Sequence, residues 1–165
     1  MIGAKMQTKG QIKSEKTLLK EIFSNMWFSV PVYQRPYVWG TDEVRELLED
    51  LKFAMTEKPD SDYFLGTFVF QSKAAMPEKG QEYDEKDLLD GQQRMTTLLL
   101  LFAVVRDLVD DEDAKADCQK CIYQKASKYM NIPERTRLQF LIRPEVQEFI
   151  ENYIKTENGT ANDEK

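Results

Sequence analysis

Apolar residues recur at every third or fourth position in two parts of the chain, and this spacing is typical of amphipathic helices. The first predicted helix begins after Ser14 and ends near Asn25 or Met26. The second begins at Thr41, a residue type that favours the N-cap position. Its predicted apolar face consists of Val44, Leu47, Leu48, Leu51 and Met55.

The sequence also predicts four strands. Three of them, Trp27–Val30, Tyr63–Gln71 and Arg137–Ile142, consist largely of aromatic and branched apolar residues. The remaining strand, Glu82–Leu89, follows a polar connection over residues 73–80 that ends in a glycine. Pro31 ends the first strand, because proline cannot donate a hydrogen bond to a sheet.

The most apolar stretch of the chain lies just after Gly91 and predicts a helix with no polar side. Such a helix should be among the most buried in the domain. Two further helices are expected, over roughly Ala114–Met130 and Pro144–Ile154, with Pro144 in the first turn of the latter. Together these elements predict an α+β domain, in which helices surround a small mixed sheet.

The length of 165 residues suits one domain with a substantial core. The expected division is a flexible segment over residues 1–13, the domain itself over residues 14–154, and a polar tail or linker over residues 155–165. No apolar run approaches the roughly 20 residues needed to span a bilayer, so no membrane contact is expected. The first ten residues also lack the apolar stretch of a signal peptide, which predicts a cytoplasmic protein.

Charge and composition exclude several functions. The net charge is −6, whereas a protein that coats nucleic acid through phosphate contacts is usually basic. The chain contains no histidine, which rules out Ser-His-Asp catalysis and histidine-based metal sites within it. Cys118 and Cys121 are predicted to be free thiols without zinc, because two ligands cannot complete a tetrahedral site.

Candidate chemistry is concentrated in the sequence DGQQR, which spans Asp90–Arg94. Gly91 allows a sharp turn and close approach of a ligand to the backbone. The free N–H groups that open the following helix form a site for an anion. Arg94 adds a planar donor suited to a phosphate or a carboxylate, so this loop is a candidate anion site.

Other polar side chains in the same loop extend this interpretation. Gln92 and Gln93 offer neutral donors and acceptors, and Thr96 and Thr97 place hydroxyl groups in the first helical turn. Asp90 offers a carboxylate for a metal ion or a ribose hydroxyl. The structural alternative remains open, in which Asp90 is the N-cap, Gly91 forms the turn and Arg94 pairs with a nearby carboxylate.

A second Gln-Arg pair occurs in the segment Tyr33–Trp39, where neighbouring prolines keep the chain extended. Gln34 and Arg35 are candidates for the same site, and Tyr33, Tyr37 or Trp39 offers an aromatic face for a base. The alternative is that the aromatic residues cover the edge of the core and that Arg35 lies on the surface.

Three stretches in this order, VPVYQRPYVW, YFLGTFVFQ and DLLDGQQRMTTLLLL, resemble the N-terminal domain of GmrSD-type modification-dependent restriction enzymes. The resemblance covers roughly Leu18 to Ile154. It implies a ParB/sulfiredoxin-like fold, a role in anti-phage defence, and binding and hydrolysis of a nucleoside triphosphate (NTP). Longer members of the family carry a C-terminal nuclease domain with a histidine-containing motif, which is absent from this chain.

The resemblance also implies roles for individual residues. The catalytic residues would be Asp90, Gln93 and Arg94, with Mg²⁺ held by Asp90. Nucleotide binding would fall to Tyr33, Gln34, Arg35, Gly91, Gln92, Thr96 and Thr97. Gly66, within the FLG sequence, would have a structural role.

Three functions follow from these observations. The first is an NTP-binding and NTP-hydrolysing regulatory domain that controls DNA cleavage by a separate nuclease domain. The second is a non-catalytic DNA-sensing or protein-interaction module in which DGQQR is structural. The third is a phosphodiesterase built on Asp90 and a metal, which lacks a second carboxylate nearby in the sequence. The first function predicts that Arg35 and Arg94 hold the same anion.

Overall fold

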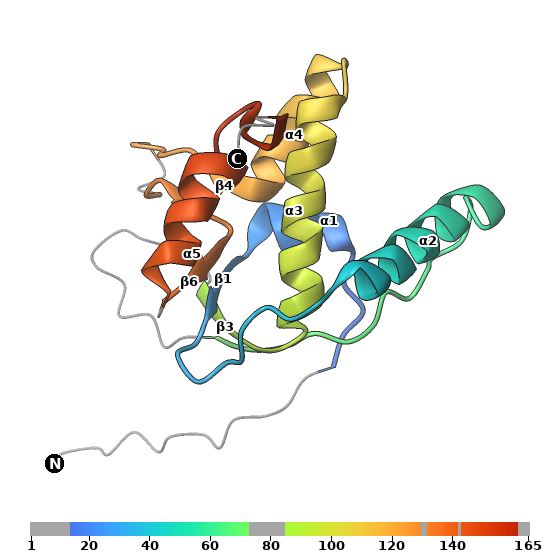
Figure 1. Cartoon of the computed structure of the whole chain (residues 1–165), viewed down its shortest axis with the longest axis horizontal. Helices are drawn as coiled ribbons and strands as arrows, with labels where there is room; N and C mark the ends of the chain where they lie inside the picture. Colours follow the sequence, from blue (N-terminus) through green and yellow to red (C-terminus); the bar gives the residue numbers. More distant parts are fainter. Residues whose placement is uncertain (1–13, 73–84, 130–131, 142, 162–165) are drawn as a thin grey trace, which may run out of the picture.

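The computed structural model of the chain describes residues 14–72, 85–129, 132–141 and 143–161 (Figure 1). Its helices and strands, in chain order, are α1 (Leu19–Asn25), β1 (Trp27–Val30), α2 (Thr41–Glu57), β2 (Val69–Ser72), β3 (Glu85–Asp90), α3 (Gln92–Leu108), α4 (Glu112–Ile122), β4 (Tyr123–Gln124), β5 (Arg135–Thr136), β6 (Leu138–Phe140) and α5 (Pro144–Phe149). A short π-helix, η1 (Ile150–Ile154), continues α5, and a 3₁₀ turn, η2 (Gly159–Ala161), follows it.

The main sheet has four strands in the order β2-β3-β1-β6. β1 lies at its centre and runs parallel to both β3 and β6, whereas β2 pairs antiparallel with β3. β4 and β5 form a separate antiparallel pair. The predicted α+β class and the small mixed sheet are therefore confirmed, and β1 has the predicted bounds.

α3 supplies the largest share of the core, as predicted. Nine of its residues are buried, compared with two in α1 and one each in α2 and α4. Phe102 also meets Phe23 of α1 edge to face, with 5.0 Å between the ring centroids. In the C-terminal half of α3, one side faces outward and is exposed at Val104, Val105 and Leu108. α3 is therefore enclosed on all sides only near its N-terminus.

α2 extends away from the rest of the molecule in Figure 1. Its N-cap is Gly40 and not Thr41, because the carboxylate of Glu43 accepts a hydrogen bond from the Gly40 N–H at 2.8 Å. The predicted apolar face is only partly covered. Leu47 is 5% exposed and packs into the core, whereas Met55 is 76% exposed.

Two predicted elements have different bounds in the structure. The strand expected over Tyr63–Gln71 is reduced to β2, because Gly66 adopts φ +113° and breaks the extended backbone before it. The helix expected over Ala114–Met130 is α4, which Asp111 caps by accepting the Ala114 N–H at 2.8 Å. It ends at Ile122 because the next two residues pair with β5.

Other boundaries shift less, and some fall where the structure gives no description. α1 begins at Leu19, later than predicted, because Leu18 is extended. The expected strand over Glu82–Leu89 is seen as β3, and residues 82–84, the connection over residues 73–80 and Ile142 lie outside the described residues. The closing helix is confirmed as α5 followed by η1, with Pro144 in its first turn.

The end of the described chain differs from the expected polar tail. Residues 155–161 fold back against α3, and Gly159 is buried. The reason is a buried pair of charges on α3, described below, that binds this segment. Within the described ranges, no helix is both long enough and apolar enough to cross a membrane.

Candidate functional site

The DGQQR turn joins the end of β3 to the start of α3. Asp90 is the last residue of β3, and Gly91 takes the N-cap position with φ +89°, so the expected alternative with Asp90 as N-cap is wrong. A glycine offers no capping side chain. The first hydrogen bond of the helix runs from the Met95 N–H to the Gly91 carbonyl at 2.9 Å. The N–H groups of the first turn therefore have no partner inside the helix.

Gly91 is also required for packing. A Cβ atom built at this position would lie 2.5 Å from a ring carbon of Phe68, so any other residue would force this ring or the backbone to shift. The positive φ adds a second reason, because residues other than glycine rarely adopt it. The loop before β2 is thereby pressed against the start of α3.

Arg94 lies in the first turn of α3 and is partly buried by the same loop. Its guanidinium carbon is 5.7 Å from the centroid of the Phe68 ring. Its Nη1 would be only 2.5 Å from a Cβ atom added at Gly66, so the guanidinium lies directly against this glycine. Among the described residues, no carboxylate or hydrogen-bond acceptor contacts the Arg94 guanidinium. The expected alternative, in which Arg94 pairs with a carboxylate, is not seen.

Gln93 is buried and points at the Tyr33–Trp39 segment. Its Oε1 accepts hydrogen bonds from the backbone N–H of Val38 at 2.7 Å and of Trp39 at 3.3 Å. Its Nε2 donates to the Pro36 carbonyl at 2.9 Å. Both ends of the amide are therefore occupied by the backbone of this loop.

Gln92 and Gln34 make further links between the two segments. The Nε2 of Gln92 donates to the Arg35 carbonyl at 3.1 Å, and the Nε2 of Gln34 donates to the Leu89 carbonyl at 2.8 Å. The Oε1 of Gln92 is buried and has no hydrogen-bond partner among the residues that the structure describes. The backbone of Arg35 thus lies beside the DGQQR turn, although the two are 57 residues apart in sequence.

The two threonines of the first turns are turned toward the protein. Thr96 and Thr97 are buried, and their hydroxyls donate to the carbonyls of Gln92 and Gln93, both at 2.8 Å. The Oγ1 of Thr97 also lies 2.9 Å from the hydroxyl of Tyr37. Since the Thr97 proton is directed at Gln93, Tyr37 is the donor in this second contact. These hydroxyls support the loop and the helix.

The remaining predicted residues are accessible. The side chains of Tyr33 and Arg35 are exposed, as is Asp90. Among the described residues, no group of three or more carboxylates or thiols is placed to hold a metal ion, so Asp90 would act alone. A small hollow next to the site is lined by Gln34 and by residues of β1, β6 and the loops after them.

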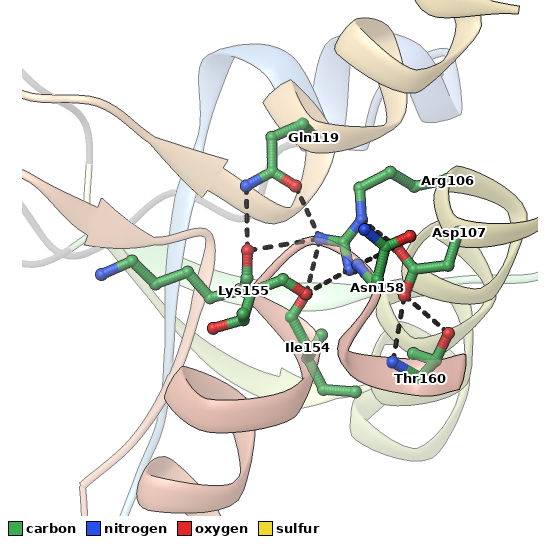
Figure 2. Close-up of polar contacts among 8 residues, drawn as sticks. Arg106, Asp107, Gln119, Ile154, Lys155, Asn158 and Thr160 are labelled. Atoms are coloured by element: carbon green, nitrogen blue, oxygen red, sulfur yellow. Dashed lines mark hydrogen bonds and ion pairs between the residues drawn. The ribbon is translucent and has the colours of Figure 1, made fainter. Parts of the chain in front are cut away.

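A second polar centre, which the sequence analysis missed, lies at the other end of α3 (Figure 2). Arg106 is 2% exposed, and its Nε and Nη2 donate to the two carboxylate oxygens of Asp107 at 2.7 and 3.1 Å. The same guanidinium donates to the carbonyls of Ile154 at 2.8 Å and Thr156 at 2.7 Å. Ile154 is the last residue of η1, so this contact caps the end of that helix, whereas the Thr156 carbonyl lies beyond it and also accepts the Gly159 N–H at 3.0 Å.

Asp107 holds the chain that follows. It accepts the Asn158 N–H at 2.9 Å, and both the N–H and the hydroxyl of Thr160, at 3.0 and 2.7 Å. Burial alone raises the pKa of Asp107, but the hydrogen bonds from Arg106, Thr160 and Asn158 outweigh it and hold the pKa well below its usual value. The centre is structural. Its only sequence signal was a pair of opposite charges at the end of an apolar helix.

Cys118 and Cys121 lie on neighbouring turns of α4 and are free thiols. Burial raises the pKa of both, which disfavours the reactive thiolate. Nothing in this geometry suggests a redox or metal site, and the prediction that they bind no zinc stays a prediction.

The chain was compared with curated proteins and with models of protein families. No curated protein matches it. A family model described as "GmrSD restriction endonuclease, N-terminal domain" matches residues 16–165, which is nearly the whole chain. This match covers every element and both polar centres described above. The chain therefore belongs to the family of GmrSD restriction endonuclease N-terminal domains.

Proposed function

We propose that this domain binds a nucleoside triphosphate at the N-terminus of α3, with its phosphates against the first-turn N–H groups and Arg94. The observation that carries the proposal is the environment of the Arg94 guanidinium. Its guanidinium is held between Gly66 and Phe68, beside a helix N-terminus with no capping side chain, and no carboxylate among the described residues neutralises it. A positive group held in place without a partner suits an external anion.

The loop that carries Arg35 supports a site for more than one phosphate. A triphosphate bears several negative charges, and one arginine with one helix terminus would leave part of that charge unmatched. The exposed Arg35 side chain starts from a backbone that Gln92 fixes beside the turn. In this proposal Arg35 swings onto the same anion, and the exposed ring of Tyr33 stacks with the base.

Hydrolysis would place Asp90 beside the phosphates. Mg²⁺ commonly binds through one carboxylate together with phosphate oxygens and water, so a single Asp90 is a sufficient protein ligand. The bound ion would neutralise charge on the transferred phosphoryl group. The residues of the chain would hold and orient the phosphate tail.

Membership in the family supports the wider role. We propose that nucleotide binding in this domain regulates DNA cleavage by a nuclease domain elsewhere, within a restriction system directed at phage DNA. The net charge of −6 agrees with this division, because a domain that binds DNA mainly through phosphate contacts is usually basic. We further propose that the fold is ParB/sulfiredoxin-like.

Calorimetric titration with each of the four common NTPs and Mg²⁺ tests the proposal. The Arg94→Ala variant should bind the preferred nucleotide with about 1.5–3 kcal/mol less affinity, because it loses a charge-assisted hydrogen bond. Arg45→Ala is the matched control, since Arg45 is an exposed arginine on α2 that already pairs with Asp42. Equal affinity of wild type and Arg94→Ala would overturn the proposal.

One observation favours the alternative, a non-catalytic module. The amides of Gln92 and Gln93 and the hydroxyl of Thr97 all contact the Tyr33–Trp39 loop, which gives much of the DGQQR region a structural task. In that case none of the four nucleotides would bind to the wild type, and both arginine variants would behave like it.

A further inference from the structure

Gln93 occupies the centre of the contact between α3 and the Tyr33–Trp39 loop. It makes three hydrogen bonds to backbone groups of Pro36, Val38 and Trp39, and its side chain is buried. A glutamine amide has one acceptor oxygen and one donor nitrogen. Here the oxygen serves two N–H groups and the nitrogen serves a carbonyl, so the amide is already committed to this loop.

The loop depends on these bonds because it has no secondary structure of its own. Residues 35–40 belong to no helix or strand, and within the described part of the chain the Gln93 oxygen is the one hydrogen-bond partner of the Val38 and Trp39 N–H groups. Gln92 adds one bond to the Arg35 carbonyl from the same helical turn. Removal of Gln93 would therefore take this hydrogen-bond partner from both N–H groups at once.

We propose that Gln93 is a positioning residue and does not take part in the chemistry of the site. It fixes the loop that carries Arg35 over the first turn of α3, so that Arg35 and Arg94 face one anion. This inference rests on the proposed nucleotide site and assigns Gln93 a task different from that of a group that activates water. By binding Trp39, Gln93 also fixes the start of α2, because Trp39 immediately precedes the Gly40 N-cap.

Hydrogen exchange measured residue by residue by NMR tests the positioning role without any nucleotide. In wild type the Val38 and Trp39 amides should exchange slowly, since Gln93 protects them. In Gln93→Ala both amides should exchange roughly tenfold faster or more, because each loses its hydrogen-bond partner. The amides of Leu98 and Leu99 in the core of α3 should stay protected, which shows that the domain is folded.

Gln92→Ala is the matched control. It removes an amide from the same turn, but one that binds a carbonyl and not the Val38 or Trp39 N–H. These two amides should therefore remain slow in this variant. Unchanged exchange at both amides in Gln93→Ala would overturn the inference.

A second measurement separates positioning from catalysis. In Gln93→Ala, nucleotide binding should weaken at least tenfold, with KM for hydrolysis rising by more than kcat falls, because a displaced Arg35 affects ground-state binding. A residue that acts in the chemical step would instead lower kcat and leave the nucleotide Kd unchanged, and that result would overturn the inference. Failure of the proposed function would look different. Arg94→Ala and wild type would then show the same nucleotide affinity, while the Val38 and Trp39 amides would still exchange faster in Gln93→Ala.

Discussion

At the scale of single residues, two glycines shape the site by what they leave out. Gly66 and Gly91 both have positive φ, and each leaves space that another side chain occupies. At Gly66 that neighbour is the guanidinium of Arg94, and at Gly91 it is the ring of Phe68. The position of Arg94 thus depends on a residue 28 positions earlier in the chain.

Gly66→Ala should both destabilise the domain and weaken nucleotide binding. The new methyl group would displace the guanidinium of Arg94, and the positive φ would strain the alanine backbone at a cost of about 1–3 kcal/mol. Chemical denaturation and titration with nucleotide measure the two effects. Gly40→Ala is the control, since its Cβ would meet Glu43 at an ordinary 3.5 Å. If Gly66→Ala matched Gly40→Ala in both measurements, the described position of the Arg94 guanidinium against Gly66 would be wrong.

Asp107 should make the domain sensitive to acid. Its pKa is lowered in the folded state, so it adds stability that is present above the unfolded pKa of about 3.9 and is lost as the pH falls through the folded pKa. The free energy of unfolding of wild type should therefore decline below about pH 4. Asp107→Asn should lack that part of the decline.

The same variant should be less stable at neutral pH, by about 3–5 kcal/mol, because Arg106 would remain as a buried charge without its counterion. Urea denaturation at pH 7 measures this loss. Asp117→Asn, which breaks an exposed ion pair with Lys120, should change little. Similar stability of the two variants would contradict the structural role of the Arg106–Asp107 pair.

At the scale of elements, α2 and α3 have the same length and opposite environments. Both contain 17 residues, yet nine residues of α3 are buried and only Leu47 is buried in α2. The helices themselves need different support. α3 is stabilised by packing in the core. The loop before α2 is held by Gln93 through Trp39, and the segment after α2 contacts Arg94 at Gly66.

Leu47→Ala and Met55→Ala should differ in stability, because the two residues lie on the buried and the exposed side of α2. Leu47→Ala should cost about 2 kcal/mol or more, because it leaves a cavity in the core. Met55→Ala should stay within about 0.5 kcal/mol, because its side chain is 76% exposed. Thermal denaturation of both variants measures this. Equal losses would mean that the outer side of α2 is covered in solution.

Sequence patterns predicted the elements better than they predicted their contacts. β1 and the start of α3 were found because apolar runs there coincide with breakers, Pro31 and Gly91. The strand at Tyr63–Gln71 was overextended because composition does not reveal the positive φ of Gly66. The motif DGQQR located the site, but the use of Gln93 by a distant loop depends on the fold, and no local pattern encodes it. The packing of residues 155–161 was missed for the same reason.

At the scale of the molecule, α3 connects the two polar centres. The candidate anion site lies at its N-terminus, and the Arg106–Asp107 pair that binds residues 154–160 lies at its C-terminus. Arg94 and Asp107 are thirteen residues apart on this helix (107 − 94), or about 20 Å at 1.5 Å per residue. Met95, Leu98, Leu99 and Ala103 between them are buried in the core, so one packed helix connects the proposed nucleotide site to the C-terminal segment.

A shared helix alone does not make the two centres cooperate, and a double-mutant cycle distinguishes the possibilities. Sites this far apart with no shared partner usually contribute independently, to within about 0.5 kcal/mol. Arg94→Ala and Asp107→Asn should therefore change the free energy of unfolding additively, and saturating nucleotide should raise the denaturation midpoint of wild type and Asp107→Asn to the same extent. Denaturation of the four proteins, with and without nucleotide, measures both. If nucleotide stabilised wild type but not Asp107→Asn, the domain would have two arrangements of α3 and the C-terminal segment, and the nucleotide would favour one of them.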